Sequence, residues 1–157
     1  ARKLLREAHD SVRDLSHELV PPVLAKLGLH HALQDLCEKN SNSMLTFKFE
    51  SPISIETRYQ LDFEVKIYYI VTELMNNIIK HSKATNGIVT VDKKNNELII
   101  VVKDNGIGFS ESKPLSNQGY GLSQIKARIK NAGGVFNLQS NNKAGTEITI
   151  KLKIPKN

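Results

Sequence analysis

The sequence predicts an α+β fold, a two-layer sandwich in which a mixed or antiparallel sheet carries helices on one face. Apolar residues recur at helical spacing over residues 61–81 and 122–132. Four further segments have the β-branched, alternating character of strands, and polar turns join them in pairs. Because each pair should form a hairpin, neighbouring strands are expected to be antiparallel. The four strand segments are 87–91, 98–103, 135–140 and 146–154.

The first 50 residues add helices and one strand. Apolar residues at helical spacing run from residue 1 to about 37, but Pro21 and Pro22 interrupt them. Because proline lacks an N–H and restricts its predecessor, the first helix should kink or end just before this pair. A shorter helix is expected over about 31–40, and residues 44–50 alternate as a strand.

Composition and charge predict one folded domain. The chain has 157 residues, 39% hydrophobic and 24% charged, which suffices for a core. The net charge is +6, but the basic residues are scattered along the sequence and form no basic patch typical of a nucleic-acid binder. We therefore expect no nucleic-acid partner. Cys37 is the lone cysteine, and no apolar run approaches the ~18 residues of a membrane span. We therefore expect a cytoplasmic location without membrane contact. Because the chain begins inside a helical pattern without Met, we also expect a piece of a longer protein.

Two glycine clusters predict a ligand site. Residues 104–109, Asp-Asn-Gly-Ile-Gly-Phe, follow a strand, and glycines at this place let a backbone approach a flat ligand closely. Residues 119–122, Gly-Tyr-Gly-Leu, open a helix whose free N–H groups suit an anion. A place for a base and a place for phosphates together indicate a nucleotide.

A polar stripe on the long helix fits the same ligand. At 100° per residue, Glu73, Asn77, Lys80 and His81 share one side, next to an apolar stripe, whereas Asn76 points elsewhere. Carboxylate, amide, ammonium and imidazole groups suit hydrated Mg²⁺ and a phosphate chain. Alternatively, the two cations only complement the helix dipole, and Glu73 only pairs with a neighbouring lysine.

These segments occur in the order found in a known ATPase family. Residues 73–81, Glu-Leu-Met-Asn-Asn-Ile-Ile-Lys-His, resemble the N box shared by sensor histidine kinases, DNA gyrase, the ninety-kilodalton heat-shock chaperone and mismatch-repair ATPases. Residues 104–109 and 119–122 resemble its two glycine boxes, and Gly145-Thr146 resembles its closing strand. The resemblance implies the Bergerat-type ATP-binding fold, with ATP and Mg²⁺ as ligands.

The resemblance implies a role for each matching residue. Asp104 would accept a hydrogen bond from the adenine amino group, Gly106 and Gly108 would lie against the base, and Thr146 would support it. Glu73 would orient the attacking group, and Asn77 would bind Mg²⁺. The resemblance implies that both are catalytic residues. The remaining implied phosphate contacts are Lys80, His81, Gly119, Gly121 and Leu122.

The first residues narrow the resemblance to nitrate-sensor-like histidine kinases. Residues 7–19 are similar to the end of the second dimerisation helix of that subfamily, and the ten residues 109–118 match its short ATP lid. This implies two parts, a dimerisation-helix remnant with its linker over 1–27 and a catalytic ATP-binding domain over 28–157. His9 superficially resembles a phosphoacceptor, but Pro21 follows too soon for a whole second helix, so the acceptor is expected upstream.

The implied function is transfer of the ATP γ-phosphate to a histidine on a dimerisation helix, for passage to a response regulator receiver domain. By this interpretation the fragment alone would not be competent for autophosphorylation. Two alternatives stay open from the sequence: a nucleotide-binding regulatory module without kinase activity, and a protein serine kinase of the anti-sigma type. The helix remnant favours the histidine kinase.

Overall fold

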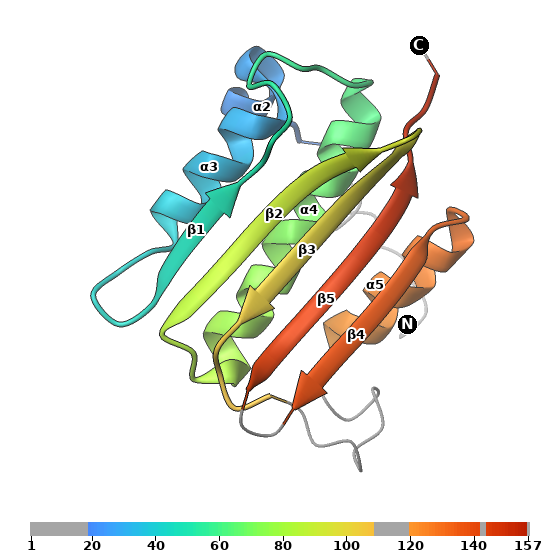
Figure 1. Cartoon of the computed structure of the whole chain (residues 1–157). Coiled ribbons are helices and arrows are strands. Elements are labelled where there is room, and N and C mark those ends of the chain that lie inside the picture. Colours follow the sequence, from blue (N-terminus) through green and yellow to red (C-terminus); the bar gives the residue numbers. More distant parts are fainter. Residues whose placement is uncertain (1–18, 109–119, 142–143, 157) are drawn as a thin grey trace, which may run out of the picture.

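A five-stranded mixed sheet forms one layer of the computed structural model, which describes residues 19–108, 120–141 and 144–156. The strands lie in the order β1-β2-β3-β5-β4, with β1 parallel to β2 and every other pair antiparallel (Figure 1). The strands are β1 (Thr46–Glu50), β2 (Asn86–Lys94), β3 (Glu97–Asp104), β4 (Val135–Asn141) and β5 (Gly145–Lys153).

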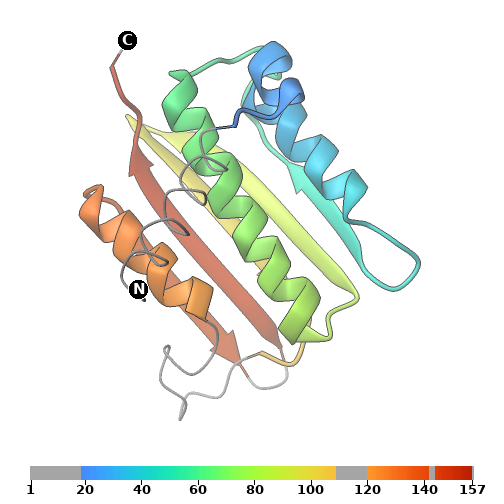
Figure 2. The ribbon, with the colours of Figure 1, turned by 180° about the vertical axis from the view of Figure 1, so that it is seen from behind.

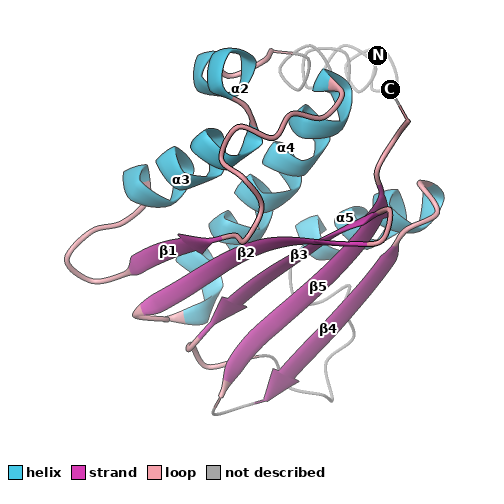
Figure 3. Cartoon of the chain, turned by 45° about the horizontal axis from the view of Figure 1, so that its top comes forward, coloured by secondary structure: helices cyan, strands magenta, loops and turns pink. Residues whose placement is uncertain are grey.

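Helices form the other layer, and all of them lie on the same face of the sheet (Figure 2, Figure 3). The central helix α4 is flanked by α3 and α5, while the short α2 sits at the end of α3. The predicted two-layer α+β fold is therefore confirmed. The helices are α2 (Pro22–Leu27), α3 (Leu29–Lys39), α4 (Leu61–Asn77) and α5 (Tyr120–Asn131), and α4 continues into a π-helical turn, η1 (Ile78–Ser82).

The strands bury alternate residues against the helices. In β3 and β5 the inward rows are aliphatic along most of their length, because successive side chains of a strand point to opposite faces. Each row ends in a polar residue, Asp104 in β3 and Thr146 in β5, and these two are register partners. The core rows therefore lead directly to two polar side chains at one end of the sheet.

Several element bounds differ from the sequence predictions. Helix α3 begins at Leu29 rather than near residue 31, because Gly28 (φ +93°) turns the chain directly from α2 into α3. Strand β2 extends to Lys94, since the turn into β3 shrinks to Asn95 and Asn96, with Asn95 at φ +57°. Neither the parallel β1–β2 pairing nor the π-helical turn was predicted from the spacing of residues.

The predicted dimerisation-helix remnant lies almost wholly outside the described residues. Of the interval 1–27 the structure describes the end, in which Pro22 opens α2 at its first turn, a position where a missing N–H costs nothing. Leu24 of α2 is fully buried in the same core as the rest of the domain. The division after residue 27 stays a prediction.

An ion pair between a partly exposed arginine and a buried glutamate connects α2 to α4. Glu64 is fully buried, and Arg58 donates to its carboxylate from Nη2 (3.1 Å) and Nε (3.2 Å to Oε2). The same Nη2 donates to the carbonyl oxygens of Leu24 and Ala25, at 3.3 and 3.4 Å. Gly28 leaves room for the guanidinium, because a Cβ there would lie 2.6 Å from Arg58 Cδ. Arg58 thus satisfies both a buried carboxylate and the carboxyl end of α2.

Removing one member of this pair is expected to destabilise the domain. Arg58→Ala leaves the Glu64 carboxylate buried with little compensation and should cost about 3 kcal/mol of unfolding free energy. Glu64→Gln keeps an acceptor for a partly exposed arginine and should cost about 1 kcal/mol. Urea denaturation measures both, with Lys48→Ala, which breaks the exposed pair with Glu50, as a control expected to change little. A larger loss in Glu64→Gln than in Arg58→Ala would contradict this assignment.

Candidate functional site: a nucleotide pocket

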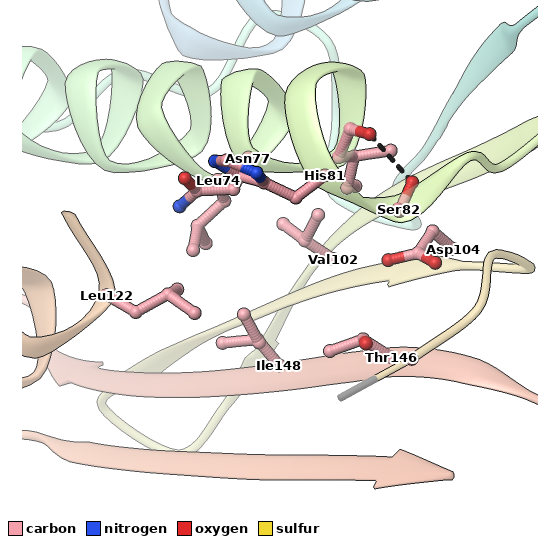
Figure 4. A pocket seen from close by; sticks show the side chains of 11 residues that line it. Leu74, Asn77, His81, Ser82, Val102, Asp104, Leu122, Thr146 and Ile148 are labelled. Atoms are coloured by element: carbon pink, nitrogen blue, oxygen red, sulfur yellow. Dashed lines mark hydrogen bonds between the residues drawn. The ribbon is translucent and has the colours of Figure 1, made fainter. Parts of the chain in front are cut away.

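A pocket of about 400 Å³, partly open to solvent, lies between the carboxyl end of α4 and the ends of β3 and β5 (Figure 4). The drawn side chains point into one common space from helix and sheet. Its lining joins segments that are far apart in the sequence. The lining residues are Leu74, Asn77, Ile78, His81, Ser82, Val102, Asp104, Gly108, Leu122, Thr146 and Ile148.

Asp104 is the buried charge of this pocket. It is 5% exposed, and its Oδ1 accepts the N–H of Gly106 at 2.8 Å. Burial raises the pKa of the Asp104 carboxyl above its ordinary value, and the backbone N–H groups of Gly106 and Thr146 oppose that rise. A carboxylate has about four lone-pair positions, so these donors leave acceptor capacity for a ligand.

The π-helical turn brings Ser82 into the pocket wall. Ser82 Oγ donates to the carbonyl of Ile78 at 2.7 Å and accepts the N–H of Ala84 at 3.1 Å. Lys83 then takes a left-handed conformation (φ +54°), which ends the helix. The sequence analysis did not identify Ser82, because its prediction assumed regular α-helical geometry up to His81. Turns of π-helix recur at functional sites, where they change the direction of side chains.

The loop after β3 is hydrogen-bonded directly to the segment after this turn. Ile107 N–H donates to the Ser82 carbonyl at 2.8 Å, and Asn105 Oδ1 accepts the N–H groups of Thr85 and Asn86, both at 2.9 Å. A Cβ on Gly106 would lie 2.2 Å from the Ser82 carbonyl oxygen. The structure therefore gives Gly106 a packing role against the helix end, while its predicted contact with a base remains a prediction.

Gly108 and Gly145 take backbone conformations that disfavour side chains. Gly108 lines the pocket at φ +70°. Gly145, at φ +84°, would place a Cβ 1.9 Å from the Asp104 carbonyl oxygen. Since glycine alone fits there, the start of β5 lies directly against the end of β3. This contact sets Thr146 beside Asp104 in the wall of the pocket.

Besides Ser82, helix α4 and its π turn contribute two polar side chains to the pocket wall, Asn77 and His81. Asn77 Nδ2 is buried and has no hydrogen-bond partner among the described residues. Buried polar atoms normally have partners, so this amide is ready for a ligand. An amide oxygen is also a ligand type that Mg²⁺ accepts, and Mg²⁺ commonly retains waters and phosphate oxygens besides one or two protein groups. The residue thus fits the metal role that the sequence analysis gave it.

Glu73 and Lys80 do not line the pocket. Glu73 lies next to α5, where its Oε1 is 4.0 Å from Nη1 of Arg128, and Lys80 is exposed. The four-residue polar stripe is therefore split, with Asn77 and His81 in the wall and the other two outside it. The stripe is split because the pocket faces the side of the helix that carries Leu74 and Ile78, which borders the polar stripe.

The second glycine cluster is described only in part. A Cβ on Gly121 would lie 3.7 Å from Asn77 Nδ2, and Leu122 is buried in the pocket wall. Since both belong to the first turn of α5, the start of that helix faces the Asn77 amide. Gly119 and the predicted lid, residues 109–118, lie outside the described residues.

Comparison with known proteins assigns the fold to a family. Residues 62–156 match the model described as "Histidine kinase-, DNA gyrase B-, and HSP90-like ATPase". The chain belongs to this ATPase family. The predicted resemblance is confirmed, and the pocket lies where the family's nucleotide-binding motifs were recognised in the sequence.

Similar proteins in this family are sensor histidine kinases. The chain is 33% identical to sensor histidine kinase LiaS of Bacillus subtilis (strain 168), a match covering 94% of this chain and 40% of LiaS. It is 28% identical to oxygen sensor histidine kinase NreB of Staphylococcus carnosus (strain TM300), over 92% of this chain and 42% of NreB. The chain thus spans less than half the length of these relatives.

Solved structures show the same fold. The catalytic domain of histidine kinase ThkA has a TM-score of 0.64 and 20% identity, covering 80% of this chain and 90% of that domain. The domain therefore has the fold of a histidine kinase catalytic domain. Among the described residues of our chain, no helix is long and apolar enough to cross a membrane.

The burial of Asp104 is expected to lower the stability of this ATPase domain at neutral pH. Because the folded state raises the pKa of Asp104, it binds the proton more tightly than the unfolded state, so stability falls as pH rises through the ordinary pKa of 3.8 and up to the folded-state pKa. Asp104→Asn removes this cost and should leave the unfolding free energy at pH 7 equal or higher. Denaturation at pH values from 3 to 7 measures the difference in unfolding free energy between the variant and the parent, which should grow with pH. If the variant lost stability relative to the parent between pH 3 and pH 7, the prediction would be contradicted.

Proposed function

We propose that this chain is the catalytic part of a two-component sensor histidine kinase, which transfers the ATP γ-phosphate to a histidine on a dimerisation helix. The observation that carries the proposal is the pocket itself. It has a buried carboxylate at one end and, on the opposing helix, an amide nitrogen that has no hydrogen-bond partner in the described part of the chain. In a family of ATPases, these two groups are suited to the two ends of ATP.

The adenine end is formed around Asp104. Its carboxylate accepts from the adenine amino group, while Val102, Ile148 and Thr146 offer a narrow, largely apolar wall for the ring. At Gly106 and Gly108 the backbone is predicted to lie close against the base. The low exposure of Asp104 strengthens such a hydrogen bond, because water competes little for the carboxylate.

The phosphate end is formed where α4 meets α5. Asn77 binds Mg²⁺ through its amide oxygen, and the metal neutralises charge on the phosphates when it is bound. Lys80 and His81 contribute positive or hydrogen-bonding groups from the exposed end of the helix. The first N–H groups of α5 supply further donors, since the start of a helix favours anions. The proposed backbone contacts are Gly119, Gly121 and Leu122.

Glu73 is proposed to orient the attacking imidazole together with Asn77, as the catalytic residues of this chain. Phosphoryl transfer depends on positioning and charge stabilisation more than on covalent chemistry by the protein. The carboxylate of Glu73 sits one helical turn before Asn77, and its Oε1 lies 4.0 Å from Nη1 of Arg128 on α5. The acceptor histidine comes from a helix of the same kinase, and a response regulator receiver domain takes the phosphoryl group onward. A cytoplasmic location is part of this proposal.

Two other functions would use the same pocket. A regulatory module would bind nucleotide without transferring phosphate, and a protein serine kinase of the anti-sigma type would phosphorylate a hydroxyl group. The sensor kinase is favoured because both curated relatives described above are histidine kinases that match over more than nine tenths of this chain. Residues 1–27, which are similar to a dimerisation helix and its linker, point the same way.

Nucleotide binding tests the site residues directly. Calorimetry should show ATP binding that Mg²⁺ strengthens. Asp104→Asn should weaken binding about tenfold to a hundredfold, since a hydrogen bond to a charged group contributes about 1.5–3 kcal/mol. Asn77→Ala should remove the Mg²⁺ dependence, whereas Asn76→Ala, on the exposed neighbour, should behave like the parent. Unchanged affinity in both site variants would refute the assignment.

Phosphoryl transfer separates the candidate functions. With labelled ATP and Mg²⁺, the domain should phosphorylate a dimerisation-helix segment supplied in trans, and the product should be acid-labile and base-stable, as phosphohistidine is. Glu73→Gln should lower the transfer rate while leaving ATP affinity close to that of the parent, because Glu73 lies outside the pocket lining. An acid-stable product would support a serine kinase instead, and tight binding without any transfer would support the regulatory module.

A further inference from the structure

A groove that is open to solvent lies between α4 and α5, two helices that run side by side in Figure 2. It encloses about 620 Å³, far more than a single water needs, and none of its described lining residues belongs to the pocket around Asp104. Val65, Tyr69 and Ile70 line it from α4, and Ile129 and Ala132 line it from the end of α5 and the residue that follows. The proposed phosphoryl transfer uses none of these five residues.

The floor of this groove is apolar and its rim is charged. Ile70 and Ile129 are buried in its floor, whereas Asp62, Lys66 and Arg128 are exposed along its sides. Apolar side chains that line an open groove gain free energy when another apolar surface covers them. A third helix can lie between two neighbouring helices, because its side chains enter the groove that their side chains leave. The groove therefore fits an amphipathic helix.

The chain itself enters the described part of the structure at this groove. The hydroxyl group of Tyr69 donates to the carbonyl oxygen of Leu19 at 2.8 Å, and Leu19 is the first residue that the structure describes. Shortly afterwards Pro22 opens α2, whose Leu24 belongs to the core. Residues 1–18 thus directly precede a point that is attached to the groove on one side and to the core on the other. Such a tether gives these residues an effective concentration at the groove that a separate molecule rarely reaches.

Residues 4–19 have the apolar pattern that this groove requires. At 100° per residue, the six apolar side chains of this segment all fall within an arc of about 100°. They are Leu4, Leu5, Ala8, Val12, Leu15 and Leu19. As a helix the segment would extend about 24 Å, close to the length of α4 with its 17 residues. A helix of this length is only marginally stable by itself in water, so its apolar stripe needs a surface to pack on.

Charge favours the same occupant. Three acidic residues of the segment lie together on one flank of the apolar stripe, between about −40° and −80° from the first leucine of the stripe. They are Glu7, Asp14 and Glu18. Lys66 lies one helical turn before Tyr69 on α4, and in the described part of the chain no carboxylate is within ion-pair distance of its amine. Because Tyr69 holds the carbonyl of Leu19, the neighbouring Glu18 comes within reach of this amine.

We propose that residues 4–18 dock as an amphipathic helix in the groove between α4 and α5 of their own chain. The apolar stripe packs on Ile70 and Ile129, and the Glu18 carboxylate lies beside the Lys66 amine. As part of a dimerisation helix the same stripe would instead face a second chain, so the groove and a dimer compete for one surface of this segment. The docking does not depend on the proposed kinase reaction, because no group of the phosphoryl transfer takes part in it.

Amide hydrogen exchange, followed by NMR on the 157-residue chain, tests the docking. Amides of residues 8–18 should exchange at least about tenfold more slowly than those of an unstructured chain, because a helix that is not docked opens readily. The protection should be the same over an about tenfold range of protein concentration, because docking within one chain does not depend on concentration. Protection that rises with concentration would show that a second copy covers the stripe and would overturn the proposal, as would unprotected amides.

Leu15→Asp removes one apolar side chain from the stripe, and His17→Asp, on the opposite side of the helix, is the matched control. Leu15→Asp should lower the protection of residues 8–18 at least about tenfold and shift the methyl signals of Ile70 and Ile129, because the docked helix loses the burial of a leucine. His17→Asp should leave both unchanged. Slow exchange of the β3 amides verifies that each variant is folded. If Leu15→Asp lowered the protection without shifting those methyl signals, the segment would pack elsewhere and the proposed groove would be wrong.

A charge exchange tests the position of the segment in the groove. Lys66→Glu should lower the protection about two- to fivefold, since exposed ion pairs contribute little, and adding Glu18→Lys to this variant should restore it. Lys130→Glu, an equal charge change at an exposed position on α5 outside the groove lining, should behave like the parent. If the double variant were no better protected than Lys66→Glu alone, the proposed pairing of Glu18 with Lys66 would be wrong.

Discussion

The proposed nucleotide pocket depends on one close contact between two backbone segments. The chain leaving β3 touches the chain leaving the π turn, with Ile107 N–H on the Ser82 carbonyl and Gly106 packed against the same oxygen. Asn105 adds four further hydrogen bonds to residues 85 and 86. A side chain on Gly106 would force the segments apart. Because Asp104 belongs to one segment and His81 to the other, this contact determines how far apart the helix and sheet groups of the site lie.

The regular patterns of helix and strand are interrupted where the chemistry is expected. The α-helical ladder of α4 gives way to a π turn, and the apolar row of β3 ends in a buried carboxylate. The amide nitrogen of Asn77 in the same space has no partner among the residues that the structure describes. Functional sites commonly break local rules that the rest of a fold obeys, and the cost is carried by the regular core around them. Here the aliphatic rows of β3 and β5 provide that core.

The two buried carboxylates among the described residues have opposite surroundings. Glu64 is paired with Arg58, which also binds the end of α2, so its charge serves to hold the helical layer together. Asp104 has backbone donors but no cation in hydrogen-bonding contact among the described residues, so its capacity remains open to the pocket. A buried charge with a full set of partners is costly to disrupt, whereas one with spare capacity is available for recognition.

The amino-acid sequence by itself determined the helices and hairpins, the α+β class and the residues around which the pocket forms. These followed from local signals: apolar periodicity, turn residues, and glycines beside polar groups. Asp104 and Asn77 could be identified because their neighbours in the chain form recognisable motifs. The parallel pairing of β1, the burial of Leu24, the π turn that exposes Ser82 to the pocket, and the Glu73–Arg128 contact were decided only in the tertiary structure. Each depends on which surfaces meet across long stretches of chain, and a periodicity of 100° per residue contains no information about such encounters.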